Sequence, residues 1–190
     1  MRVRQYITAC CILAVLALQG CSTAAVKETG DDRARFTERP SSEPYWKDLK
    51  IETSAIDLIY DQIKVYVHVN VTSFNGNVLL SGEVPDEATR EAIGKIVSGV
   101  EGARHVNNEL AITENSSLLS RSNDSLITSG VKLRFVGDSR FSAGDVRVVT
   151  ENGVVFLMGR VKRAEADAAA DIASTTNRVK RVVKLFEYTD

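Results

Sequence analysis

The chain has 190 residues, of which 44% are hydrophobic and 26% are charged, and its formal net charge is −1. This composition leaves room for one ordinary domain or two small ones and excludes a fibrous or wholly disordered protein. The near-neutral charge argues against binding to nucleic acid, all the more because removal of two N-terminal arginines would leave a net charge of −3.

The N-terminal residues combine two basic residues with a short apolar run. Arg2 and Arg4 precede the run from Tyr6 to Leu18, which is shorter than the about 20 residues that a membrane-spanning helix needs. The run leads into the sequence L-Q-G-C at residues 18–21. This tetrapeptide resembles the lipobox of bacterial lipoproteins, although Gln19 stands where a small or aliphatic residue is more usual. We therefore predict a lipoprotein signal peptide.

The resemblance implies that residues 1–20 are removed and that Cys21 is lipidated. In such lipoproteins diacylglycerol is attached to the thiol and the new amine is acylated, with palmitate as the expected chain. The acyl chains would hold the protein on a membrane permanently, because each buried CH₂ contributes about 0.8 kcal/mol. By the sorting rule of Gram-negative lipoproteins, Ser22 implies the outer membrane, facing the periplasm. The alternative is an ordinary secretory signal or a membrane-anchoring segment in which Cys21 has no special role.

The other cysteines, Cys10 and Cys11, lie within the predicted signal peptide. The mature chain would therefore keep a single, modified cysteine. Neither a disulfide nor a thiolate metal site is expected in it.

Residues 21–48 are predicted to form a flexible tether. They contain glycine, prolines and many charges but no sustained apolar period, so they cannot bury enough surface to offset the entropy of ordering. A flexible segment of this length spans on the order of 30 Å. Tyr45 and Trp46, near its end, are expected either at the lipid interface or against the first domain.

An internal repeat organises the rest of the chain. Residues 71–84 and 148–161 share an Asn-Gly pair, an apolar run, a second glycine and a closing valine. Asn75-Gly76 and Asn152-Gly153 suit tight hairpin turns that need positive φ. The second glycines, Gly82 and Gly159, are interpreted as residues that relieve the backbone at a corner.

Each predicted hairpin is preceded by a helix and followed by a helix and a strand. The later helices are predicted at 85–96 and 164–173, and the closing strands at 106–112 and 179–188. The earlier helices are predicted from apolar faces made of Ile56, Ile59, Tyr60 and Ile63 in the first copy and of Ile127, Val131 and Phe135 in the second. Each copy is therefore an αββαβ unit.

The expected fold class is α+β, with two domains that each pack a small three-stranded mixed sheet on two helices. The first domain is predicted at 49–114, a short polar linker at 115–121 and the second domain at 122–190.

Several motifs of these units carry a family resemblance. They are G-A-R-H-V-N-N at 102–108, T-E-N-G at 150–153, F-L-M-G at 156–159 and A-A-A-D-I-A-S at 168–174. The αββαβ unit with these motifs resembles the BON domain. Two such units behind a lipobox resemble the dual-BON-domain outer-membrane lipoprotein family (DolP/YraP-like). The resemblance implies a non-enzymatic protein that supports envelope integrity, binds anionic phospholipid through the first helix of its second domain and localises to division sites.

The lipid-contacting helix of that family carries a tryptophan in a stretch that corresponds to S-N-D-S-L-I-T at 122–128, so Leu126 takes the tryptophan's place. At about 100° per residue, Leu126 and Leu133 lie about 140–160° from the centre of the predicted core face. Lys132 and Arg134 are close in sequence and add the positive charge that an anionic membrane attracts. The candidate phospholipid-binding residues are Leu126, Ser129, Gly130, Lys132, Leu133 and Arg134. The alternative is that the two leucines pack against the first domain.

Charge is unevenly divided between the predicted domains. Residues 49–114 hold five Lys/Arg and ten Asp/Glu, a net charge of −5, whereas residues 122–190 hold eleven and nine, a net charge of +2. A basic second domain suits an anionic membrane, with a second cationic group made of Arg178, Lys180, Arg181 and Lys184. Alternatively, the two domains attract each other.

No pattern in the sequence indicates catalysis. His68 and His105 are too few for a metal site without cysteines, and each is expected at a surface or edge position. Asp86 and Glu87 are better suited to capping a helix than to acid–base chemistry. We therefore expect no enzyme, metal or cofactor. The alternative function is a protein-interaction scaffold for envelope assembly, cell division or regulation of cell-wall hydrolases, with the lipid used only as an anchor.

Overall fold

The structure, a computed structural model, describes residues 42–113 and 118–190. Residues 40–190 form one compact unit. The predicted signal peptide and Cys21 lie outside the described residues. Within the described part, no helix has the length and apolar character needed to cross a membrane.

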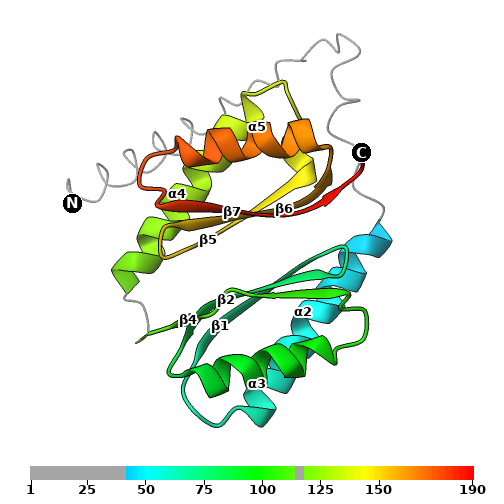
Figure 1. Ribbon diagram of the computed structural model, residues 1–190, viewed down its shortest axis with the longest axis vertical. Coiled ribbons are helices and arrows are strands. Elements are labelled where there is room, and N and C mark those ends of the chain that lie inside the picture. The colour runs from blue at the N-terminus through cyan, green and yellow to red at the C-terminus, as the bar shows by residue number, and fades with distance from the viewer. Residues whose placement is uncertain (1–41, 114–117) are drawn as a thin grey trace, which may run out of the picture. The chain divides into compact units, whose positions relative to one another are not determined.

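Two αββαβ units follow one another, as the sequence predicts (Figure 1). The first consists of α2 (Ser42–Gln62), β1 (His68–Phe74), β2 (Asn77–Val84), α3 (Glu87–Ser98), β3 (His105–Asn108) and β4 (Ala111–Ile112). The second consists of α4 (Leu118–Val136), the 3₁₀ turn η3 (Ala143–Asp145), β5 (Val146–Glu151), β6 (Val154–Val161), α5 (Arg163–Ser174) and β7 (Arg181–Tyr188).

Both sheets are mixed. In the first, β2 lies in the centre, antiparallel to β1 and parallel to β3 and β4. In the second, β6 is antiparallel to β5 and parallel to β7. The closing strand predicted at 106–112 is interrupted at Glu109 and Leu110, where β3 ends and β4 has not yet begun. The predicted α+β fold with small mixed sheets on helix pairs is confirmed.

The two hairpin turns have the predicted left-handed backbone. Asn75 and Gly76 have φ of 52° and 74°, and Asn152 and Gly153 have φ of 50° and 80°. Asparagine and glycine are the residues that adopt this region at least cost.

A carboxylate from the preceding helix holds each turn. Asp48 of α2 accepts hydrogen bonds from the backbone N–H of Asn75 (2.8 Å) and of Gly76 (2.9 Å). Asp124 of α4 accepts the equivalent bonds from Asn152 (2.8 Å) and Gly153 (2.7 Å). The helix and the hairpin of each unit are thereby fixed to one another through charge-assisted bonds.

Gly82 and Gly159 are required by close approach of the neighbouring strand. A Cβ atom at Gly82 would lie 2.1 Å from the carbonyl oxygen of His68, and one at Gly159 would lie 2.2 Å from that of Asp145. Any other residue would push the two strands apart, so these glycines are needed inside paired strands and not at a corner, as we had predicted.

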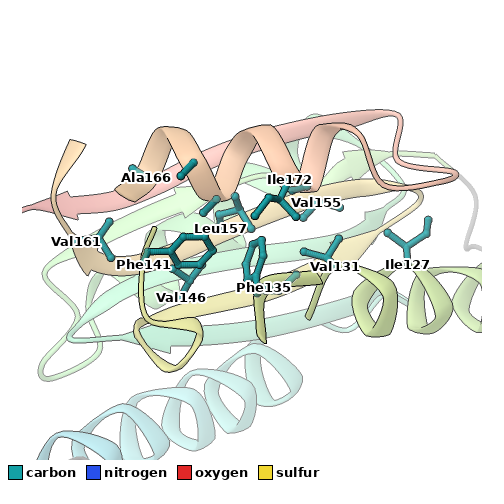
Figure 2. Close-up of a cluster of buried hydrophobic side chains, with 14 residues drawn as sticks. Ile127, Val131, Phe135, Phe141, Val146, Val155, Leu157, Val161, Ala166 and Ile172 are labelled. Atoms are coloured by element: carbon teal, nitrogen blue, oxygen red, sulfur yellow. The ribbon is translucent and has the colours of Figure 1, made fainter. Parts of the chain in front are cut away.

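The helices of each unit cover one face of its sheet and form a core with it. In the second unit, Ile127, Val131 and Phe135 of α4 are buried with side chains of α5, β5 and β6, and Figure 2 shows them pointing into this cluster. The core face predicted for α4 is therefore confirmed.

In the first unit, the prediction that Tyr60 belongs to the core face was wrong, because its side chain is 56% exposed. The buried positions of α2 are Ile51, Ala55 and Ile59, a stripe four residues apart that begins closer to the N-terminus than the predicted face.

Both first helices begin earlier than the predicted domain boundaries. The helix α2 starts at Ser42, so residues 42–48, which we assigned to the tether, are helical. Likewise, α4 starts at Leu118, inside the predicted linker. The helix α3 has the predicted cap, since Asp86 Oδ1 accepts a hydrogen bond from the N–H of Thr89 at 2.7 Å.

A third apolar cluster joins the two units within the compact part of the chain. Leu79 of β2 is buried together with Phe156 and Met158 of β6. Around it, Arg147 pairs with Glu52 at 3.1 Å, Arg181 with Glu109 at 3.7 Å and Arg104 with Glu187 at 2.9 Å. In the pairs of Arg147 and Arg181, a cation of the second domain meets an anion of the first, which agrees with the alternative interpretation of the charge asymmetry, whereas the pair of Arg104 has the opposite direction.

Candidate functional site

The side of α4 that faces away from the core carries three exposed apolar side chains. Leu126, Leu133 and Val136 are 63%, 76% and 77% exposed. Leu126 and Leu133 are seven residues apart, almost two full helical turns, so they project on the same side. The alternative that these leucines pack against the first domain is wrong, because both side chains are largely accessible to solvent.

Two cations flank this apolar stripe. At about 100° per residue, Lys132 and Arg134 lie about 100° to either side of Leu133. The side chain of Lys132 is exposed and makes no hydrogen bond or ion pair with any residue that the structure describes. Arg134 is exposed as well, but its guanidinium donates to the carbonyl oxygen of Ile172 at 2.7 Å and to two threonine hydroxyls beyond it, at the C-terminal end of α5. Of the two cations, Arg134 is therefore the one held by hydrogen bonds to its neighbours.

Ser129 and Gly130 lie between the two leucines. The hydroxyl of Ser129 is exposed and donates to the carbonyl oxygen of Ser125 at 2.9 Å, within the helix. A Cβ atom at Gly130 would lie 3.4 Å from the Thr176 methyl group. A Cβ at Gly130 would therefore make an ordinary van der Waals contact, and the exposed hydroxyl of Ser129 is the polar group between the two leucines.

We call this surface the α4 outer face: Leu126, Ser129, Gly130, Leu133 and Val136, flanked by Lys132 and Arg134. Of the six residues that the sequence indicated, all but the half-buried Gly130 are exposed, and their binding to phospholipid stays a prediction. Val136 was not predicted, although its position three residues after Leu133 would have indicated it.

The apolar surface continues into a recess beside the C-terminal end of α4. Lys132 and Val136 line a cavity of about 740 Å³, together with Leu49 of α2, Phe74 of β1 and Arg147 of β5. The α4 outer face is therefore not an isolated ridge.

The second predicted cationic group is mostly engaged. Arg178 donates to Asn123 at 3.0 Å, Lys184 pairs with Asp167 at 2.9 Å and Arg181 pairs with Glu109 at 3.7 Å. These contacts leave this group less able than the α4 outer face to attract an anionic surface.

The structure also brings together three titratable residues that the sequence did not connect. His68 Nδ1 lies 2.8 Å from Glu83 Oε2, and Glu151 lies beside them. Burial raises the pKa of the Glu151 carboxyl, and the charges of Glu83 and Asp124 raise it further, whereas a hydrogen bond from Asn70 and the nearby His68 lower it. His68 lies on the edge strand β1, which agrees with the expected surface or edge position, but its side chain is only 19% exposed. His105 is exposed, as expected.

The described residues thus form two αββαβ modules whose most distinctive surface is an apolar helix face with flanking cations. This arrangement defines a tandem pair of αββαβ domains. The BON domain family matches residues 51–114 and 123–190, and the chain belongs to the family of outer-membrane lipoproteins with two BON domains.

Three relatives show how far the similarity extends. The outer membrane lipoprotein DolP of Haemophilus influenzae is 39% identical over 93% of this chain and 93% of its own. The 21 kDa hemolysin of Actinobacillus pleuropneumoniae is 33% identical over 86% and 84%. The osmotically-inducible protein Y of Escherichia coli is 32% identical over 70% and 66%. The protein is therefore an envelope-associated lipoprotein of the outer membrane, in a family that is not enzymatic.

Proposed function

We propose that this lipoprotein is anchored through Cys21 in the outer membrane, faces the periplasm and uses its second BON domain to dock on anionic phospholipid. Docking occurs through the α4 outer face. In this way the protein supports envelope integrity without acting as an enzyme. It accumulates in regions rich in anionic lipid, such as division sites.

The observation that carries the proposal is the exposure of Leu126 and Leu133, at 63% and 76%. Burying a leucine side chain contributes about 1.5–3 kcal/mol, so two leucines inserted at the lipid interface supply a useful affinity. Lys132 and Arg134 add about 1 kcal/mol each near an anionic surface. Because Cys21 already keeps the domain close to lipid, this second contact need not be strong.

Vesicle flotation tests the docking contact without the acyl anchor. Residues 40–190, the compact unit, are mixed with vesicles of phosphatidylcholine alone or with added phosphatidylglycerol. We expect flotation only with the anionic vesicles, weakening as salt is raised. The variant Leu126→Glu should lose it, whereas Leu126→Trp should strengthen it, since an indole prefers the membrane interface.

Leu58→Glu is the matched control, since Leu58 is a partly exposed leucine on α2. It should float like the unsubstituted protein. Equal flotation of Leu126→Glu and Leu58→Glu, or no flotation at all, would contradict lipid docking. In cells, crosslinking from the α4 outer face to a defined envelope protein, with Leu126→Glu still functional, would favour the alternative role as an interaction scaffold.

A further inference from the structure

An imidazole and two carboxylates converge at a place distinct from the α4 outer face. His68 of β1 and Glu83 of β2 are direct partners across their strand pair. Glu151 is the last residue of β5, in the second BON domain. One ligand atom from each of the three lies within 4.8 Å of the other two. Two domains therefore contribute to one group of possible metal ligands.

Asparagine side chains orient both carboxylates. Asn152 Nδ2 donates to Glu83 Oε1 at 2.7 Å, and Asn70 Nδ2 donates to Glu151 Oε2 at 3.0 Å. The amide of Asn152 is itself fixed, because its Oδ1 accepts a hydrogen bond from Ser120 at 2.8 Å. Carboxylates that bind metal ions are commonly held in this way by a hydrogen bond to one oxygen.

A crevice leads from the solvent to two of these ligands, His68 and Glu151. It has a volume of about 440 Å³, and His68 and Glu151 line it together with Asn70, Thr128 and Thr150. This is far more space than the roughly 30 Å³ that a water molecule occupies in the liquid. An ion has a path to the cluster, and a water can complete its coordination.

A buried hydroxyl nearby lacks a partner. Ser81 Oγ is buried and makes no hydrogen bond within the part of the chain that the structure describes. Ser81 lies two residues before Glu83 on β2, hence on the same face of the sheet, and directly opposite Asn70 on β1. Buried polar groups in proteins almost always have a partner. A water bound to an ion at the cluster would supply one.

We propose that His68, Glu83 and Glu151 bind a divalent transition-metal ion, and that Zn²⁺ fits them best. Zinc accepts imidazole and carboxylate ligands and commonly takes three protein ligands and one water. Calcium requires six to eight oxygen ligands, which this set lacks. The ion takes the place of the proton between His68 Nδ1 and Glu83 Oε2, and that proton passes to solvent.

The positive charge of the ion offsets buried negative charge. Glu83 and Glu151 are 0% and 9% exposed, and Asp124, buried close by, contributes to the raised pKa of Glu151. Asp124 is not itself a ligand, because its two oxygens accept the N–H groups of Asn152 and Gly153. Since the ligands come from β1, β2 and β5, the bound ion cross-links the two BON domains.

Calorimetric titration with Zn²⁺ tests the site directly. Residues 40–190 form the compact unit, and both hydrophobic cores lie in it. They contain no cysteine, so thiolates cannot contribute to binding. We expect one ion per chain, with a dissociation constant in the micromolar range or below. At a hundredfold excess over that constant, the melting temperature should rise by about 5 °C or more.

The chain offers a matched pair of variants because it has two histidines. His68→Gln should weaken binding by more than tenfold, whereas the exposed His105→Gln should bind like the unsubstituted protein. Asn70→Ala removes a residue that orients Glu151 without removing a ligand, so we expect a loss of about tenfold. Circular dichroism verifies that each variant is folded.

Imidazole NMR signals of the unsubstituted protein give an answer that needs no variant. Zn²⁺ should shift the ring signals of His68 up to one equivalent and leave those of His105 in place. The absence of saturable binding at millimolar Zn²⁺, a response of both histidines alike, or undiminished binding by folded His68→Gln would each overturn the proposal.

Discussion

The first helices of the two BON domains take the same structural role with different exposed surfaces. Asp48 of α2 and Asp124 of α4 hold their hairpin turns in the same way, which sets the correspondence between the helices. At the positions of Leu126 and Leu133, α2 carries Lys50 and Asp57. One repeat therefore presents charges to solvent where the other presents leucines.

The central strands differ in the same manner. Relative to the equivalent glycines Gly82 and Gly159 of the two repeats, Glu83 of β2 corresponds to Arg160 of β6. The Glu83 side chain is fully buried and meets His68, whereas that of Arg160 is 64% exposed. The turns and the cores are alike in the two repeats, whereas side chains at other equivalent positions differ in charge and exposure.

The strongest test of the shared framework is truncation of the core under each first helix. Phe135→Ala in α4 and Ile59→Ala in α2 remove equivalent side chains, each 1% exposed. We expect losses of about 3–5 kcal/mol for Phe135→Ala and about 2–5 kcal/mol for Ile59→Ala in the free energy of unfolding. Denaturant unfolding of residues 40–190 measures both. A loss below about 1 kcal/mol for either variant would refute the common role of the helices.

The two carboxylates that hold the turns should contribute different amounts to the free energy of unfolding. Asp124 is buried whereas Asp48 is half-buried, and hydrogen bonds to charged groups contribute about 1.5–3 kcal/mol, most where water is excluded. We expect Asp124→Ala to cost about 2–3 kcal/mol and Asp48→Ala to cost less. Thermal unfolding of the two variants side by side shows which substitution destabilises the protein more. A larger loss for Asp48→Ala would show that burial of the carboxylate does not determine the size of the loss.

The difference between the exposed surfaces of α4 and α2 can be tested by placing the residues of α2 at the equivalent positions of α4. The double variant Leu126→Lys with Leu133→Asp should lose flotation with anionic vesicles by about tenfold or more, because two leucine insertions are removed. Its stability should change by about 0.5 kcal/mol or less, since surface positions contribute little to folding. Retained flotation would show that lipid docking does not depend on what distinguishes α4 from α2.

Local patterns in the sequence were sufficient to predict much of the fold. The Asn-Gly pairs predicted both turns, and the spacing of Ile127, Val131 and Phe135 predicted which side of α4 is buried. The same spacing predicted that Leu126 and Leu133 are exposed. The prediction for Tyr60 was wrong because an amphipathic pattern does not indicate where a helix begins. The helix α2 begins at Ser42, earlier than the sequence indicated.

Contacts between distant segments could not be predicted in this way. Nothing near Asp124 in the sequence indicates that its carboxylate binds the turn at Asn152. Likewise, His68, Glu83 and Glu151 are ordinary residues in three separate strands. They meet only because β1 and β2 pair and because the two domains pack together, so no spacing of ligand residues along the sequence indicates that they form a cluster.

Arg134 has a consequence for how firmly the α4 outer face can hold a membrane. A long cationic side chain normally loses rotational freedom when it engages a ligand, at a cost of about 0.5–1.5 kcal/mol. The guanidinium of Arg134 is already held by the end of α5, so most of that freedom is lost when the protein folds. The side chain of Lys132, on the other flank, keeps its rotational freedom in the folded protein and loses it only on binding. The two flanks therefore present one preorganised and one adaptable charge, and the first should contribute the more persistent contact.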